Sequence, residues 1–491
     1  MLFFLKQIFV LAVCLCFWIP LAVYFVQFLA PVTLFIFLLY TVEEFVFVKL
    51  FNAYSGLAAE DWYWQTDNAT NRGIINSVLV LQGAPDVARL RETFQERLLD
   101  DDSADSDTYT KARMFVKKGI LNQYWVPEKE FKLEDHVWQW SKKVAESKRE
   151  LQMILEELMI RPFPPERALW ECIVVPYCVE NVNQTVLLYR VHHSMADGVS
   201  LAYFLCNKLP QNPPPTPQTL RKFTQTNRVA LMAKGIFLIP WHAGKMMLRQ
   251  TDSTILHVPD VTGKKIFKWS DEIELGLIKD IKSKLKLTIN DILMGCFSKG
   301  LHDYFKAKGA PNQNDLLAFL PVDTRANVER ARHFGNKFSM IYFSLPVGYD
   351  DPVETVLETK RRIDKFKTSG EPFASRWTMR TAAYFLPKLL SGVSFWSFAK
   401  KASIVVSNVP GPQTEIVIGG QVLNYMTFWP PARYNIGSSA SFFSYNGKVH
   451  FGFCADEAVN VDPEVIIDAF NKAVKDLANQ LDIRTDNNND F

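Results

Sequence analysis

The stretch that decides the fold is residues 186–205, VLLYRVHHSMADGVSLAYFL. Residues 186–191 are apolar and β-branched enough to form a strand that is buried on both faces. The last eight residues can begin a helix, and HHSMADG lies in between, at residues 192–198. Two adjacent histidines, a carboxylate four residues after the second and then a glycine rarely coincide by chance, so the pattern indicates a functional site.

The chemistry of this loop depends on the imidazole, the side chain best suited to take up a proton near pH 7. In the turn after a buried strand, the ring can project into a cleft while the strand holds it rigidly. Asp197 can fold back and hold the loop from behind, and Gly198 allows a sharp turn or the close approach of a substrate. A metal site is less favoured because no further ligand cluster is obvious, and Ser194 lacks the G-x-S-x-G setting of a serine nucleophile.

Length and composition exclude several classes of protein. The chain has 491 residues, enough for two domains with sizeable cores, and its hydrophobic content of 48% is that of a globular protein. The formal net charge of +3 argues against nucleic acid as a partner, because there is no basic excess to neutralise phosphates. The seven cysteines are scattered, which predicts free thiols in a reducing compartment.

The N-terminal region is strongly apolar. Residues 7–42 carry no charge and are numerous enough for one long or two short membrane helices, which Pro20 and Pro31 would kink. The run is longer than the apolar core of a signal peptide, typically about 7–15 residues. We therefore predict a retained membrane anchor over residues 1–51, either a hairpin that dips into the membrane or a pair of spans.

The remaining chain divides at a proline-rich segment. Residues 52–208 form a first half that contains HHSMADG, 209–222 a linker, 223–484 a second half, and 485–491 a polar tail. Strands and helices alternate irregularly in both halves, which predicts a mixed α/β (α+β) fold. Residues 229–248 are apolar with a few cations, so they form either a buried helix or a helix on the membrane surface.

HHSMADG resembles the HHxxxDG motif of CoA-dependent acyltransferases. Further segments resemble the wax ester synthase/diacylglycerol acyltransferase (WS/DGAT) family in the same order: Arg167-Ala168-Leu169-Trp170, Asn290-Asp291, Pro321-Val322-Asp323-Thr324-Arg325, Gly335-Asn336 and Ser407-Asn408-Val409-Pro410-Gly411-Pro412. The ordered set is more specific than HHxxxDG alone, and it extends from about Leu57 to about Leu481. One departure is Ala168, where the family usually has a proline; it concerns the rigidity of that loop and not the chemistry.

The resemblance implies the two-domain fold of chloramphenicol acetyltransferase, with a tunnel between the halves and His193 at its centre. It also implies acyl transfer from acyl-CoA to an alcohol, with His193 as the general base. Asn290 is the candidate donor to the oxyanion, and a helix cap is an equally good interpretation of that residue. His192 is expected to pack near the site rather than to act as a second base.

The other candidate residues have supporting roles. A carboxylate buried behind the loop needs a partner, and we predict that Arg325 of the second half pairs with Asp197 and holds the two halves in register. Leu169 and Trp170 are candidates for the wall of an acyl channel, with ordinary core as the alternative. No metal and no cofactor are expected, since acyl-CoA is itself the substrate.

The predicted protein is thus a membrane-anchored O-acyltransferase. Its partners are acyl-CoA, membrane lipid and either a long-chain alcohol, giving a wax ester, or diacylglycerol, giving triacylglycerol. We expect it at the endoplasmic reticulum membrane with the catalytic part in the cytosol, or at the surface of lipid droplets. The alternatives are an acyltransferase with another acceptor, such as a sterol or a small alcohol, and a lipid-binding protein without activity.

Overall fold

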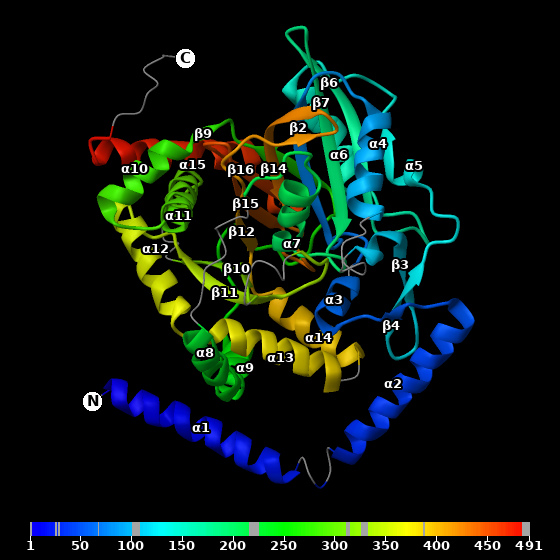
Figure 1. The fold of residues 1–491 in the computed structure, drawn as a ribbon. Coiled ribbons are helices and arrows are strands. Elements are labelled where there is room, and N and C mark those ends of the chain that lie inside the picture. Colours follow the sequence, from blue (N-terminus) through cyan, green and yellow to red (C-terminus); the bar gives the residue numbers. More distant parts are fainter. Residues whose placement is uncertain are drawn as a thin grey trace.

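Two β-sheets lie side by side in the body of the molecule, with helices packed around them (Figure 1). The computed structural model describes residues 2–24, 27, 30–66, 68–100, 109–215, 225–310, 315–325, 332–385 and 388–483. The predicted linker 209–222 lies only partly within these residues, and the predicted tail 485–491 lies outside them. The domain boundaries expected from the sequence stay predictions.

The first sheet has the strand order β13-β14-β2-β7-β6-β5. The bounds of its strands are Ile74–Gln82 (β2), Val137–Gln139 (β5), Trp170–Val179 (β6), Val182–His192 (β7), Val417–Ile418 (β13) and Gln421–Trp429 (β14). β2 and β7 are antiparallel, with Ile74 opposite His192. β14 comes from the second half of the sequence and pairs with β2, so both halves of the chain build this sheet.

The second sheet has the order β11-β10-β12-β15-β16-β8, with β9 also paired to β16. Its strands are Lys265–Trp269 (β8), Ile273–Glu274 (β9), Asp315–Asp323 (β10), Phe338–Pro346 (β11), Ile404–Pro410 (β12), Ser438–Tyr445 (β15) and Lys448–Asp456 (β16). β15 and β16 form a hairpin that is joined at Asn446-Gly447, where both residues have positive φ, 44° and 78°. A small third sheet contains Ser55–Gly56 (β1), Met114–Lys118 (β3) and Gln123–Pro127 (β4).

Helices cover the sheets and extend along one side of the body (Figure 1). Their bounds are Leu2–Tyr24 (α1), Ala30–Phe51 (α2), Ala59–Trp62 (α3), Val87–Phe94 (α4), Leu133–His136 (α5), Lys148–Met159 (α6), Gly198–Tyr203 (α7), Gln225–Phe237 (α8), Ile239–Leu248 (α9), Leu275–Leu285 (α10), Ile289–Ala307 (α11), Pro352–Lys367 (α12), Glu371–Phe385 (α13), Lys388–Ala399 (α14) and Pro463–Gln480 (α15). The mixed α/β fold predicted from the sequence is confirmed.

The start of α11 shows how sequence directs one of these helices. Thr288 caps it: its hydroxyl accepts a hydrogen bond from the Asp291 amide, and the Asp291 carboxylate accepts one from the Thr288 amide. This reciprocal pair is a capping box, which satisfies two amides that a helix start leaves without partners. Thr288 is therefore the cap of α11, and Asn290, for which a helix cap was the alternative interpretation, lies within the first turn.

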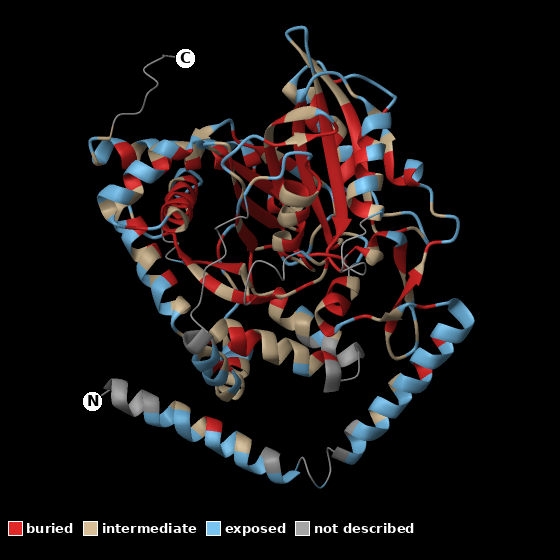
Figure 2. Cartoon of the chain, in the orientation of Figure 1, coloured by how far each residue is buried: buried red, intermediate tan, exposed pale blue. Residues whose placement is uncertain are grey.

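The apolar N-terminal region forms α1 and α2, which lie against the body at separate places. Trp18 Nε1 on α1 donates to the Phe237 carbonyl at the end of α8, at 3.1 Å. Glu43 on α2 accepts hydrogen bonds from the amides of Leu121 and Asn122, both at 2.9 Å, in the turn between β3 and β4. Most other side chains described on these two helices are exposed (Figure 2).

The prediction of membrane spans is not supported. Of the described residues, none belongs to a helix that is long and apolar enough to cross a membrane. The second half of α2 carries Glu43, Glu44 and Lys49, and Glu43 is bound to the body of the protein.

Candidate active site

The HHSMADG loop joins β7 to α7 and is buried between the two sheets. The His193 amide donates to the Gly73 carbonyl at 2.7 Å, which ties the loop to the start of β2. At its other end, Asp197 caps α7, with Oδ1 accepting a hydrogen bond from the Ser200 amide at 3.0 Å. The loop is therefore held at both ends by hydrogen bonds to the backbone, which gives its side chains fixed directions.

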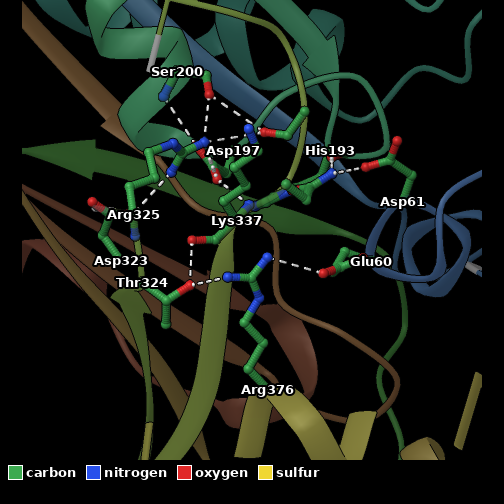
Figure 3. A network of polar contacts seen from close by, with 12 residues as sticks. Glu60, Asp61, His193, Asp197, Ser200, Asp323, Thr324, Arg325, Lys337 and Arg376 are labelled. Atoms are coloured by element: carbon green, nitrogen blue, oxygen red, sulfur yellow. Dashed lines mark hydrogen bonds and ion pairs between the residues drawn. The ribbon is translucent and has the colours of Figure 1, made fainter. Parts of the chain in front are cut away.

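The side chain of His193 is held from two sides. Its ring stacks on the indole of Trp64, with the ring centroids 3.7 Å apart and the planes at 11°. Its Nδ1 lies 3.0 Å from Oδ1 of Asn336, and Nδ2 of Asn336 donates both to the His193 carbonyl at 2.7 Å and to Asp61 Oδ1 at 2.9 Å. Lys111 Nζ lies 2.7 Å from the other oxygen of Asp61. Figure 3 shows Asp61 beside His193 in this network.

These contacts decide which ring nitrogen carries the proton. Nδ2 of Asn336 faces two acceptors, so the amide oxygen is the atom that faces His193, and an amide oxygen can only accept. Nδ1 of His193 therefore donates, and Nε2 keeps its lone pair. Burial lowers the pKa of His193 to about 4, opposed by the charge of Asp197. A neutral imidazole with Nε2 available is the form in which histidine accepts a proton from a hydroxyl.

Asp197 lies behind this loop and faces Arg325 at the end of β10. Arg325 Nη2 is 2.8 Å from Asp197 Oδ2 and donates to the Ser200 hydroxyl at 2.7 Å, while the Lys337 amide donates to Asp197 Oδ2 at 2.9 Å. Arg325 also pairs with Asp323 at 2.9 Å. The charge of Arg325 and these hydrogen bonds outweigh burial, so the pKa of Asp197 is lower than usual. The structure thus brings together the two residues expected to pair, one from each half of the chain (Figure 3).

The structure also places the remaining predicted residues of the loop. His192 is buried, with Nδ1 2.9 Å from the Ser194 hydroxyl, which in turn accepts a hydrogen bond from Gln65 at 2.8 Å. Ser194 is therefore bound to His192 and not to the candidate base. Gly198 is the first residue of α7 and its φ is not positive; an added Cβ would meet only Val409 Cγ2, at 3.8 Å. The sharp turn considered for this glycine is absent.

Three predicted residues lie outside the network around His193 in the described part of the chain. Asn290 Oδ1 accepts a hydrogen bond from Asn408 at 3.0 Å, which connects α11 to the SNVPGP segment on β12. Trp170 is buried in the core of the first sheet, where it donates to the Ala112 carbonyl at 2.7 Å. Leu169 is partly buried against the same core. For Trp170 the structure favours the core interpretation over an acyl channel.

Several residues that hold His193 were missed from the sequence. Asp61 and Trp64 lie in the aromatic segment after the N-terminal helices, and Lys111 and Asn336 follow 50 and 275 residues after Asp61. Gly335-Asn336 is part of the resemblance to the family, but the resemblance implied no role for it. No local pattern connects these four positions, because only the folded chain brings them together.

The mixed α/β fold, with a buried HHxxxDG histidine, is the arrangement that the sequence resemblance implies for an acyltransferase. The sequence matches the wax ester synthase/diacylglycerol acyltransferase catalytic domain over residues 65–262 and the WS/DGAT C-terminal domain over residues 334–478. The protein therefore belongs to the wax ester synthase/diacylglycerol acyltransferase family, and the prediction of an O-acyltransferase of this family is confirmed.

Similar proteins occur in bacteria and plants. The chain is 23% identical over 390 residues to the probable diacylglycerol O-acyltransferase tgs1 of Mycobacterium tuberculosis, covering 72% of this chain and 81% of that protein. It is 24% identical over 379 residues to wax ester synthase/diacylglycerol acyltransferase 11 of Arabidopsis thaliana, covering 66% and 76%.

Solved structures share the fold. The wax ester synthase/diacylglycerol acyltransferase of Marinobacter aquaeolei VT8 matches with a TM-score of 0.61 and 18% identity, over 87% of this chain and 100% of that chain. The first condensation domain of the calcium-dependent antibiotic synthetase matches with a TM-score of 0.57 and 12% identity, over 87% and 96%.

Proposed function

We propose that the protein transfers a fatty acyl group from acyl-CoA to the hydroxyl of a long-chain alcohol or of diacylglycerol, with His193 as general base. The observation that carries this proposal is the contact between His193 Nδ1 and Asn336 Oδ1, which leaves Nε2 as the proton acceptor. The Mycobacterium and Arabidopsis relatives bear the names of enzymes with these acceptors.

In the proposed reaction, Nε2 of His193 takes the hydroxyl proton as the oxygen attacks the thioester carbonyl carbon. The new C–O bond forms, the C–S bond then breaks, and the imidazolium returns its proton to the CoA thiolate. Proton and electron pairs balance without a metal or a covalent acyl-enzyme. A positioned base of this kind typically accelerates a reaction by about 10²–10⁴-fold.

We propose Asn290 as the donor to the oxyanion of the tetrahedral intermediate. Its Oδ1 accepts a hydrogen bond from Asn408, which turns Nδ2, the donor group, away from that contact. The neighbour of Asn408, Val409, lies beside Gly198, so this pair is close to the HHSMADG loop. Removing one such donor typically costs about 10²–10³-fold in kcat, and Asn290→Ala should show a loss of this size in kcat.

We further propose that α1 and α2 attach the enzyme to the endoplasmic reticulum membrane as a hairpin lying in the lipid, with the catalytic part in the cytosol. Large apolar side chains project from both helices, among them Phe9, Ile19, Leu34, Phe37 and Leu50, each at least 59% exposed. Apolar patches of this extent mark surfaces that another apolar phase covers. All seven cysteines are free, in keeping with a reducing compartment.

The test of the reaction is turnover of labelled palmitoyl-CoA with hexadecanol, diacylglycerol, a sterol or a small alcohol as acceptor. Transfer to hexadecanol or diacylglycerol supports the proposal, and transfer to a sterol or small alcohol alone contradicts the choice of acceptor.

Membrane attachment is tested by flotation of the full chain with vesicles. Asn68-Ala69-Thr70 and Asn183-Gln184-Thr185 fit the N-glycosylation pattern, so glycosidase-sensitive mass at either asparagine would place the catalytic part in the lumen and contradict the orientation.

A further inference from the structure

Two neighbouring cavities lie where the two halves of the chain meet. The smaller, of about 40 Å³, is lined by Ile74 and Asn76 of β2 and by residues of β8, β15 and β16. The larger, of about 390 Å³, is lined by residues that include Trp396 and Asn435. Thr70 lines both, so the cavities adjoin, and we call them together the junction tract. Ile74 lies opposite His192 in the sheet, so the inner end of the junction tract adjoins the catalytic loop.

The junction tract is positively charged. Arg72 and Lys265 line its smaller cavity and Lys400 its larger one, against a single lining carboxylate, Asp260. In the described part of the chain, none of these three cations forms an ion pair: Arg72 donates to the Ile160 carbonyl, Lys265 to the Asn71 amide oxygen, and Lys400 lies over the Trp396 ring.

Lys265 makes this arrangement costly without a further anion. Burial and the charge of Arg72 lower the pKa of Lys265, and the Asp456 carboxylate only partly opposes the shift. Asp456 already accepts hydrogen bonds from Thr262, Gly263 and Ala458. A phosphate bound between Lys265 and Arg72 would offset both this desolvation and the repulsion between the two cations.

The smaller cavity is also lined by neutral polar groups that have no hydrogen-bond partner among the described residues. Asn76 Oδ1 and the Ser438 hydroxyl are fully buried and have no hydrogen-bond partner among the described residues. Both residues line this cavity together with Ser439. Buried polar atoms without partners are rare in native proteins and are normally satisfied by water or by a ligand. The Ser438 hydroxyl can donate to an anion and the Asn76 amide group can rotate to do so.

We propose that the junction tract binds the phosphate-bearing nucleotide end of the acyl donor, a CoA thioester; this assignment rests on the proposed function. Lys265 and Arg72 contact phosphate oxygens, since charge-assisted hydrogen bonds to phosphate are the strong ones available to these side chains. Lys400 contacts a second phosphate at the wider end, where the partly exposed Trp396 also lines the cavity.

The experiment measures binding of CoA, pantetheine and inorganic phosphate to the full chain by calorimetry. Pantetheine lacks the phosphates and the nucleotide. Its affinity therefore measures the contribution of the pantetheine arm without that of the charged end of CoA. We expect Lys265→Met and Lys400→Met each to weaken CoA binding at least about tenfold and to leave pantetheine binding unchanged. Lys264→Met is the matched control, because Lys264 is the exposed neighbour of Lys265 and pairs with Glu457 at 3.5 Å.

The outcomes separate this inference from the proposed function. Unchanged CoA affinity in a folded Lys265→Met/Lys400→Met protein overturns it. Loss of inorganic phosphate binding in that variant with CoA binding intact overturns the assignment to the acyl donor and leaves an anion site of another origin. If CoA binding depends on Lys265 but labelled palmitoyl-CoA transfers to no acceptor, the proposed function fails and the nucleotide site stands.

Discussion

The indole of Trp64 lies flat against the imidazole of His193, at a centroid distance of 3.7 Å. The Arg433 guanidinium also lies over the Trp64 ring, 5.2 Å from its centroid. It donates hydrogen bonds to the backbone carbonyls of Trp64 and Tyr63, both at 2.9 Å. The candidate base is thus one layer in a stack that the backbone holds. The stack restricts rotation of His193, so its Nε2 keeps one direction.

Replacing Trp64 tests whether this stack positions the base. Trp64→Leu removes the flat surface, and we expect kcat to fall at least about tenfold, because small misplacement of reacting groups is costly. Trp64→Phe keeps an aromatic face and should retain most of kcat. Steady-state kinetics of CoA release, read as kcat and KM separately, measure both variants. Full kcat in a folded Trp64→Leu protein would remove the positioning role.

His193→Ala should abolish ester formation while the protein stays folded. The reason is that the base is needed in the transition state, and its loss alone costs about 10²–10⁴-fold. His192→Ala should cost less, since His192 contacts Ser194 and not Asn336. Thermal unfolding checks that both variants are folded. Near-normal turnover by His193→Ala would contradict the mechanism, and equal losses at both positions would require the two roles to be reassigned.

The pH dependence of kcat/KM follows from the lowered pKa of His193. The base is active when neutral, and its pKa of about 4 keeps it neutral throughout the range from pH 6 to 8. The rate should therefore be flat over that range and should fall with decreasing pH only near pH 4. Because burial disfavours the charged form of His193, the free energy of unfolding also decreases as the pH falls below about 6.5, the ordinary pKa of histidine. An acid limb centred near pH 6.5 would contradict the buried setting.

Asn336 is expected to set the protonation of His193. Asn336→Leu removes the acceptor of the Nδ1 proton, and we expect kcat to fall at least about tenfold because the wrong tautomer becomes accessible. Asn336→Asp keeps an acceptor and adds a negative charge, so the acid limb of the pH profile should move to higher pH. Asn479→Leu, an exposed change on α15, is the control. An unmoved acid limb in Asn336→Asp would contradict the assigned contact.

Asp197 should matter more for structure than for chemistry. Asp197→Ala removes one of the two carboxylates that pair with the buried Arg325 guanidinium, and breaking a buried pair is typically worth about 3–5 kcal/mol. We expect a lowered melting temperature together with lost activity, whereas His193→Ala should lose activity alone. The double variant Asp197→Ala/Arg325→Ala should be less damaging than the sum of the single changes. Strictly additive losses in melting experiments would reopen a direct catalytic role for Asp197.

The loop and its ion pair could be predicted from the sequence because their signals are local or chemically obligatory. HHSMADG carries its own pattern, and a buried carboxylate requires a cation. The contacts of Asn336 could not be predicted, since Asp61, His193 and Asn336 are joined only by tertiary folding. The same holds for the pairing of β14 with β2, which has no signal in either strand. The apolar length of residues 1–51 favoured a membrane hairpin or a pair of spans, and the contacts of Glu43 with the Leu121 and Asn122 amides could not be predicted from that length.

That late pairing of β14 with β2 has a consequence for how the protein is made. During synthesis, residues 74–82 leave the ribosome with one edge uncovered until residues 421–429 follow, about 340 residues later. At roughly 5–20 residues per second, the wait is on the order of 20–70 s. Throughout it, a long apolar strand edge is open to other nascent chains. We therefore expect a chain that ends before residue 421 to leave this edge of β2 without its partner and to be more prone to aggregation than the full chain.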